Sequence, residues 1–103
     1  MLLAARDVHE VAEGLTREQL AVSKRDQLAL AKAVELVGEA ASRVSEKTRQ
    51  AHGQIPWRRI VGMRHRLVHD YQNLDLDILW GVVRDEIPPL IAALEPLIPP
   101  EDG

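Results

Sequence analysis

Apolar residues recur along this chain at the spacings of amphipathic helices, and no stretch alternates between apolar and polar positions as a half-buried strand does. The longest such pattern predicts a helix over residues 24–50. Its seam, with spacings of four, three, four and three, consists of Leu30, Val34, Val37, Ala41 and Val44. A second set widens this stripe beyond the needs of one bundle core: Leu28, Ala29, Ala33, Leu36 and Ala40. The width indicates a second close helix contact, which a partner subunit could supply.

Capping residues mark the elements before this long helix. A first helix over residues 1–13 is expected to end at Gly14, because glycine tolerates the left-handed conformation that closes many helices. Thr16 and Gln19 fit a capping box that opens a short helical turn, and Ser23 can then cap the long helix.

Proline and polar residues mark the elements after it. Pro56 is expected near the start of a third helix that runs to about Asp70. Asn73 is expected to cap a fourth helix, which the Pro88-Pro89 pair interrupts before a last short helical segment.

These elements predict an all-α fold: an up-and-down four-helix bundle with a short extra C-terminal helix, in one domain over residues 1–103 with a frayed tail at about 98–103. Phe is absent and only one Tyr and two Trp are present, so the core must be aliphatic. A chain of this length buries a thin core, and association with a second copy would stabilise it.

Composition excludes several classes of protein. The absence of cysteine excludes a disulfide scaffold and thiolate chemistry, and it fits a reducing, cytoplasmic compartment. No apolar stretch approaches the roughly 20 residues of a membrane span, and the first six residues are too short and wrongly charged for a secretory signal. The net charge of −3 disfavours a general nucleic-acid coat, so nucleic acid would have to bind a local basic patch.

A basic segment does occur between residues 56 and 71, which hold four arginines against one aspartate. Guanidinium groups bind phosphate through paired hydrogen bonds, so Arg58, Arg59 and Arg66 are candidate RNA-binding residues. The alternative is a solvated helix face whose arginines pair with glutamates elsewhere in the chain.

Arg64 differs from these because it falls in the apolar series of the third helix, where a guanidinium needs a partner. Glu35 or Glu39 could supply one, and the alternative partner is a phosphate. His69 could act as a general acid or base, or be structural. In a regular helix Arg64 and His69 point about 140° apart. Both could reach one phosphate only if the helix loosens near its end or a second subunit completes the site.

Metal and cofactor chemistry has little support in the sequence. His65 and His69 have a spacing that can ligate a metal, but no H-E-x-x-H pattern, carboxylate cluster or Gly-rich phosphate loop accompanies them, so we expect no metal and no cofactor. Trp57 and Trp80 occupy apolar helical positions and are expected in the core. Tyr71 lies where the third helix should end, and its hydroxyl could reach solvent or the site.

Residues 55–80 combine the runs I-P-W, L-V-H-D-Y and D-L-D-I-L-W, and residues 36–41 upstream read L-V-G-E-A-A. Together with the signature R-x(4)-H-x-Y, here Arg64, His69 and Tyr71, they resemble the HepT-like branch of the HEPN superfamily over about residues 14–97.

The resemblance implies a dimer that brings two motifs into one cleft. It further implies a metal-independent endoribonuclease that acts as a toxin, with a minimal nucleotidyltransferase as antitoxin and AMP transfer to Tyr71. Arg64 would hold the scissile phosphate and His69 would move a proton, with His65 and Glu39 as supporting residues.

The chain departs from the family pattern in two places. The residue after the motif arginine is often Asn and is here His65, and the first helix starts abruptly at Met1, so we expect it to be short. The alternative function is a non-catalytic helical dimer that binds nucleotide or a nucleotidyltransferase partner, which the net charge of −3 slightly favours. A small helical scaffold with no site is a third interpretation.

Overall fold

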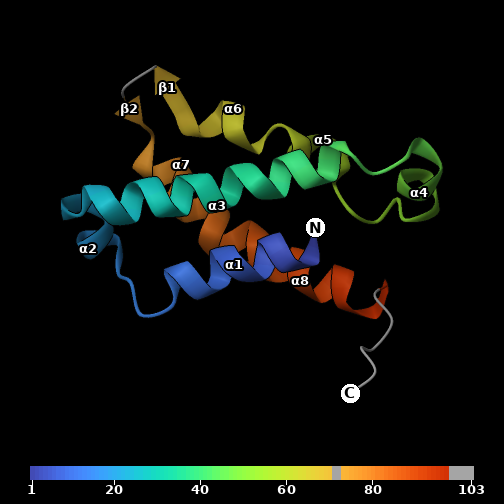
Figure 1. The fold of residues 1–103 in the computed structure, drawn as a ribbon, viewed down its shortest axis with the longest axis horizontal. Coiled ribbons are helices and arrows are strands. Elements are labelled where there is room, and N and C mark those ends of the chain that lie inside the picture. The colour runs from blue at the N-terminus through green and yellow to red at the C-terminus, as the bar shows by residue number, and fades with distance from the viewer. Residues whose placement is uncertain (71–72, 98–103) are drawn as a thin grey trace.

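The structure, a computed structural model, describes residues 1–70 and 73–97 (Figure 1). Tyr71 and the tail that the sequence predicts to be frayed lie outside the described residues. The elements follow the chain as α1 Leu2–Ala12, α2 Arg17–Val22, α3 Lys24–Ser42, α4 Glu46–Ala51, α5 Trp57–Val61, α6 Met63–Leu67, β1 Val68–Asp70, β2 Asn73–Leu74, α7 Leu76–Gly81, the π-helix η1 Val82–Glu86, α8 Ile87–Leu94 and the 3₁₀-helix η2 Glu95–Leu97. The fold is all-α, as predicted, except for one short hairpin that the sequence analysis did not predict.

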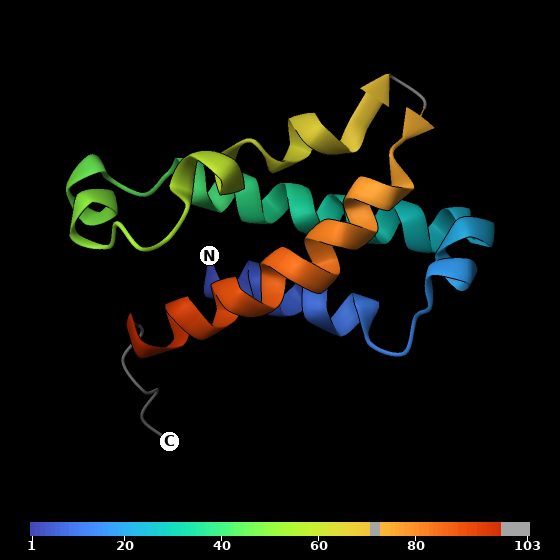
Figure 2. The same ribbon diagram turned by 180° about the vertical axis from the view of Figure 1, so that it is seen from behind.

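Helix α3 is the central element of the bundle. Helix α1 packs along one side of it and α5 and α6 along the other, while α8 lies against α1 (Figures 1 and 2). The predicted seam of α3 accounts for this position, since Leu30, Val34, Val37 and Ala41 are all fully buried. Every buried core side chain in the described part of the chain is apolar and none is aromatic, as the composition predicts.

The two tryptophans lie at the edge of this core rather than inside it. Trp57 and Trp80 are both partly buried and pack against the core cluster. The Trp57 Nε1–H donates a hydrogen bond to the backbone carbonyl of His52 at 3.0 Å, which satisfies the polar end of the ring.

Gly38 allows α3 and α5 to approach closely. A Cβ atom at this position would lie 3.1 Å from the carbonyl oxygen of Ile60 and 3.4 Å from that of Val61. Any larger side chain would therefore push α5 away from α3. The start of α6, which follows α5 in the chain, would be displaced with it.

Three predicted helix ends are confirmed. Gly14 follows α1 with a φ of +81°, in the left-handed region that favours glycine. Thr16 and Gln19 form the predicted capping box of α2. The Ser23 hydroxyl accepts a hydrogen bond from the backbone N–H of Asp26 at 3.2 Å and caps α3.

The predicted single helix over residues 24–50 is wrong near its C-terminal end, where it is interrupted between Ser42 and Glu46. Helix α3 ends at Ser42, and a separate helix α4 begins after Ser45, whose hydroxyl accepts a hydrogen bond from the Thr48 N–H. Arg49 reaches back to donate to the carbonyls of Ala41 at 3.0 Å and Val44 at 3.1 Å. Its guanidinium thus adds hydrogen bonds to carbonyl groups at the end of α3 and in the turn that follows it.

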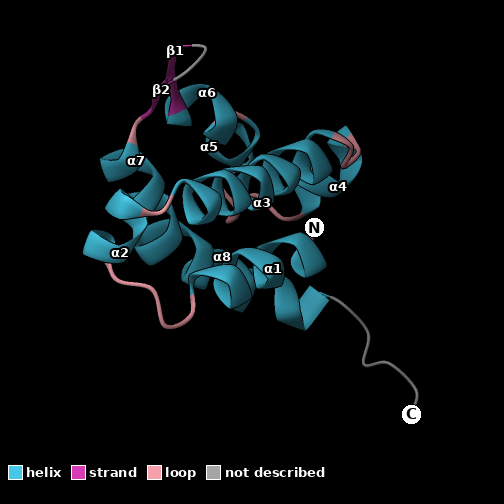
Figure 3. Ribbon diagram, turned by 60° about the vertical axis from the view of Figure 1, so that its left-hand side comes forward, coloured by secondary structure: helices cyan, strands magenta, loops and turns pink. Residues whose placement is uncertain are grey.

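The predicted third helix to about Asp70, and the absence of strands, are also wrong. The helix is broken at Gly62 and ends at Leu67, and β1 pairs antiparallel with β2 in an irregular two-stranded ladder. Figure 3 shows this hairpin in magenta at one end of the bundle. The cap of α7 is Asp75, whose side chain accepts from the Ile78 N–H at 3.1 Å, and not Asn73, which lies in β2.

The Pro88-Pro89 pair changes the helix without ending it. Helix α7 continues into η1, and α8 starts at Ile87 with both prolines in its first turn, where a missing N–H costs no hydrogen bond. Within residues 1–70 and 73–97, no helix is both long and apolar enough to cross a membrane.

Candidate functional site

The motif residues lie where a helix gives way to the hairpin. Arg64 belongs to α6 and His69 to β1, and the helix between them ends at Leu67. They therefore do not share one regular helix. Of the two alternatives that the sequence left open, the structure shows a helix that ends before His69. The backbone carbonyl of Leu67 accepts a 2.8 Å hydrogen bond from the N–H of Asp75, which closes the base of the hairpin.

A cleft lies beside α6, between it and α3. It has a volume of about 370 Å³ and is lined by Glu35, Gly38, Glu39, Ser42, Val61 and His65. The structure thus brings the two supporting candidates, His65 and Glu39, to the same cleft. His65 directly follows Arg64 in the chain. The Glu39 carboxylate accepts a hydrogen bond from Arg43 at 2.9 Å, and Glu35 lies 3.9 Å from the Lys32 ammonium. The pairing of Arg64 with Glu35 or Glu39 stays a prediction.

The outer face of α3 borders this cleft. Leu28 is 56% exposed and Leu36 is 41% exposed, with Ala29 exposed between them. We call these three residues the α3 stripe. Glu39 falls on the same side of the helix as Leu28 and Leu36, because positions three, four, seven and eight residues apart share a face. Whatever covers the α3 stripe also borders the cleft that holds His65.

Two of the three candidate RNA-binding arginines are paired within the protein. Glu86, on η1, accepts hydrogen bonds from Arg59 Nε at 2.7 Å and from both terminal nitrogens of Arg66 at 3.0 Å. Arg58, Arg59 and Arg66 also line an open groove of about 570 Å³ with Pro56, Trp57 and Gly62. In the part of the chain that the structure describes, Arg58 makes no ion pair.

Sequence reasoning did not identify Glu86. It lies 20 and 27 residues from its two partners and carries no motif, so only the general expectation of glutamate partners applied to it. Burial of the Glu86 carboxyl disfavours its charged form, but the hydrogen bonds and charges of Arg66 and Arg59 outweigh this and hold the pKa of Glu86 below its usual value. The hydrogen bond between Arg59 and Glu86, together with the negative charge of Glu86, raises the pKa of Arg59.

The Glu86 network has a predictable pH dependence. Because the pKa of Glu86 is lower in the folded than in the unfolded chain, its stabilising effect is complete above the unfolded value and is lost as the pH falls through the folded value. We expect Glu86→Gln to lower the free energy of unfolding by about 1 kcal/mol at pH 7, and the difference from wild type to vanish in acid. Urea unfolding at pH 7 and pH 3 measures both effects.

Glu95→Gln is the matched control. Glu95 is exposed, and its single ion pair, with Arg6 at 3.4 Å, is expected to contribute little to stability. A loss of stability in Glu86→Gln that persists unchanged at pH 3 would show that charge pairing is not its cause.

Comparison with known proteins identifies the class of the chain. The family described as "Ribonuclease HepT-like" matches residues 1–97. The chain therefore belongs to the HepT-like ribonuclease family, which confirms the resemblance that the motif carries.

Individual relatives agree with this assignment. "Probable ribonuclease HepT" of Thermococcus cleftensis is 35% identical over 92 residues, which cover 85% of this chain and 84% of that protein. "Putative RNase MJ1380" of Methanocaldococcus jannaschii is 28% identical over 95 residues, which cover 92% of this chain and 87% of that protein. No solved structure matches the chain.

Proposed function

We propose that this chain is a metal-independent RNA endonuclease that acts as the toxin of a toxin–antitoxin pair. The observation that carries the proposal is the match to the HepT-like ribonuclease family over residues 1–97, a range that includes Arg64, His69 and the cleft beside α6. The relatives named above as ribonucleases support an RNA substrate.

The chemistry assigned to the motif is a phosphoryl transfer within RNA. The Arg64 guanidinium holds the scissile phosphate and neutralises the charge that builds up on it in the transition state. His69 takes the proton from the 2′-hydroxyl that attacks phosphorus, or gives one to the 5′ oxygen that leaves. His65 stands beside this centre as a second proton carrier or phosphate ligand, and Glu39 restrains Arg64. Arg58, together with Arg59 and Arg66 in the open groove, binds the flanking RNA backbone.

The active form is a homodimer in which each cleft is composite. The α3 stripe supports this, because exposed leucines on the central helix of a thin bundle are a surface that a second copy can cover. A partner seated there would border the cleft beside α6 and could bring its own motif to it.

The antitoxin is a minimal nucleotidyltransferase that transfers AMP to the hydroxyl of Tyr71. With ATP as donor, the tyrosine oxygen displaces pyrophosphate and forms a phosphodiester. The added group is bulky and negatively charged, so it would exclude RNA by steric overlap and by repulsion of its phosphates. This assignment follows from the family motif that Tyr71 completes.

Cleavage of RNA by the purified protein in excess EDTA tests the proposal. We expect single-stranded RNA to be cut internally at the same rate with and without chelator, since Arg64 and His69 need no metal to act. Cleavage that EDTA abolishes and Mg²⁺ restores would refute the metal-independent mechanism.

One observation favours the alternative of a non-catalytic dimer that binds nucleotide or a nucleotidyltransferase. Arg59 and Arg66 are neutralised by Glu86, which reduces the positive surface available to RNA. The alternative predicts that expression of wild type and of Arg64→Ala is equally harmless to a host cell, whereas the toxin proposal predicts growth arrest by the wild type alone.

A further inference from the structure

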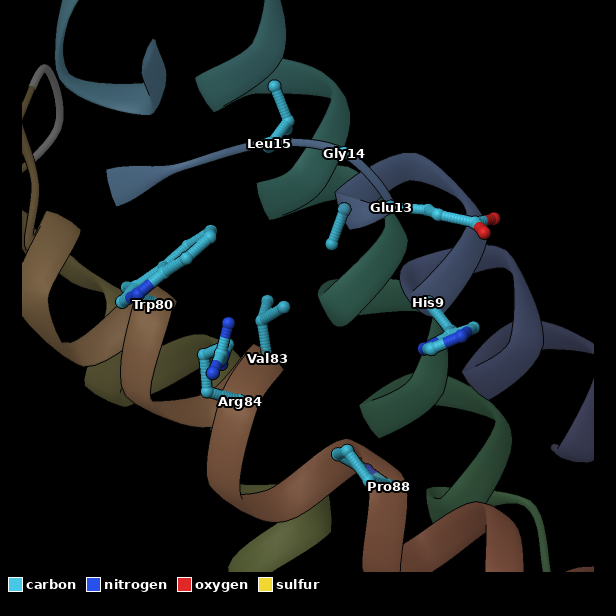
Figure 4. A pocket seen from close by; sticks show the side chains of 9 residues that line it. His9, Glu13, Gly14, Leu15, Trp80, Val83, Arg84 and Pro88 are labelled. Atoms are coloured by element: carbon cyan, nitrogen blue, oxygen red, sulfur yellow. The ribbon is translucent and has the colours of Figure 1, made fainter. Parts of the chain in front are cut away.

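A second pocket lies on the opposite side of α3 from the cleft beside α6, where the end of α1 faces η1 and α7 (Figure 4). Its volume of about 380 Å³ falls in the range of small-molecule sites. The described residues that line it include His9, Glu13, Gly14, Trp80, Val83 and Arg84. None of them belongs to the R-x(4)-H-x-Y signature, although Trp80 ends the D-L-D-I-L-W run.

The walls of this pocket combine an aromatic surface with positive charge. The Arg84 guanidinium carbon lies 5.8 Å from the centre of the Trp80 ring, in the range of a cation–π contact. Figure 4 shows the indole of Trp80 reaching into the pocket near Val83, with His9 on the α1 wall and the carboxylate of Glu13 turned away. Arg84 and His9 are both exposed and therefore accessible to a ligand.

The backbone on both sides of this pocket is unusual for a site between two packed helices. Val83 and Arg84 belong to η1, a π-helical segment, and such segments occur frequently at functional sites. On the other side, Gly14 turns the chain with a φ of +81°, and nothing lies within 4 Å of the place where its side chain would begin. The pocket is thus open at this turn and is closed by Trp80 and Val83 at its base.

The pocket is also close in the chain to the proposed catalytic centre. Helix α7 starts directly after the hairpin that contains His69 and rises about 6 Å from Leu76 to Trp80. The hairpin, α7 and the connection from α1 to α2 all lie at the same end of the molecule (Figure 1). Because α3 lies between the cleft beside α6 and this pocket, an RNA strand that occupies both must pass around this end of the molecule.

We propose that this pocket binds one nucleotide unit, with the base against Trp80 and the phosphate held by Arg84 and His9. Base stacking on an aromatic side chain tolerates any sequence, and the guanidinium beside it supplies the charge that a phosphate needs. A nucleotide of the single-stranded RNA substrate is one source of this chemistry, and that part of the inference rests on the proposed ribonuclease function. A free nucleoside monophosphate has the same chemistry and is distinguished by the experiment.

The experiment measures binding apart from cleavage. Calorimetry records the affinity of an Arg64→Ala protein for adenosine 5′-monophosphate and for a six-nucleotide RNA with 2′-O-methyl riboses, which lacks the attacking hydroxyl. Arg84→Ala in the same background is expected to weaken both interactions about fivefold, and Trp80→Leu about tenfold. Lys47→Ala removes an exposed positive charge on α4, outside the pocket, and is expected to change neither.

The outcomes separate the two sources of the nucleotide. Competition between the monophosphate and the oligonucleotide identifies the pocket as a substrate subsite, and Arg84→Ala should then raise KM for RNA with kcat unchanged. Binding of the monophosphate without competition identifies a site for free nucleotide.

Two further results bear on the proposals separately. Equal affinities in Arg84→Ala, Trp80→Leu and Lys47→Ala would overturn the nucleotide site. Absence of RNA cleavage by wild type, with Arg84-dependent binding intact, would refute the ribonuclease function and leave this site standing.

Discussion

Alanine in place of His69 is expected to lower kcat for RNA cleavage by about 10²- to 10⁴-fold, because the proton transfer loses its carrier. Arg64→Ala is expected to lower kcat by about 10²- to 10³-fold, through loss of transition-state charge stabilisation. Arg64→Lys should recover only part of the rate, since an ammonium ion lacks the paired geometry with which a guanidinium binds phosphate. Initial rates on a labelled single-stranded RNA measure all three.

Matched controls remove the same residue types elsewhere. His52→Ala at the end of α4 and Arg6→Ala on α1 are expected to cleave RNA at the wild-type rate. Circular dichroism of every variant shows whether the bundle is intact. A folded His69→Ala protein that cleaves RNA normally would exclude His69 as the proton carrier.

The second large effect concerns the α3 stripe. The double variant Leu28→Glu, Leu36→Glu is expected to be monomeric and to lose RNA cleavage, although both side chains are exposed in the single chain. Each leucine that a second copy buries contributes about 1 kcal/mol, since about half of its surface is already covered in the single chain, and a two-fold interface contains every substitution twice. Light scattering measures the mass in solution, and the same sample is assayed for cleavage.

Leu3→Glu is the control for this variant. Leu3 is 73% exposed on α1, away from the α3 stripe, so its substitution tests whether any charge in place of an exposed leucine has the same effect. A dimer that survives the double substitution, with full activity, would show that the α3 stripe is not the subunit interface.

Local signals predicted much of the fold. The positive φ of Gly14, the capping box of Thr16 with Gln19 and the cap at Ser23 each depend on residues within a few positions of one another. The seam of α3 and the aliphatic core likewise follow from periodicity and composition. These features are readable because their causes lie within a helical turn or two.

The wrong predictions have two causes. Ser45 caps a new helix through a contact as local as that of Ser23, but the apolar spacing through Val44 favours continuation of the helix. The apolar spacing of the third helix continues past Leu67, while the hydrogen bond from Asp75 and the β1–β2 pairing convert that segment to a hairpin. The hairpin depends on contacts that the local pattern does not contain.

In the candidate site, too, the features that depend on local sequence were predicted and those that depend on contacts between distant residues were not. The motif predicted the candidate residues, and the structure places His65 and Glu39 at one cleft, while their supporting roles stay predictions. The partners of Arg59 and Arg66 were not predictable, because Glu86 lies 27 and 20 residues away in the chain and meets them only in the folded protein. The pocket at Trp80 likewise requires α1 and η1 to be placed side by side.

Cleavage by a mixture of two inactive variants tests the composite cleft most directly. Arg64→Ala and His69→Ala proteins are unfolded together and refolded as mixed dimers. If the arginine of one subunit works with the histidine of the other, half of the dimers are mixed and each contains one intact site, so about a quarter of the wild-type rate should return. A mixture as inactive as its components would show that the two groups act within one subunit, contrary to the proposed mechanism.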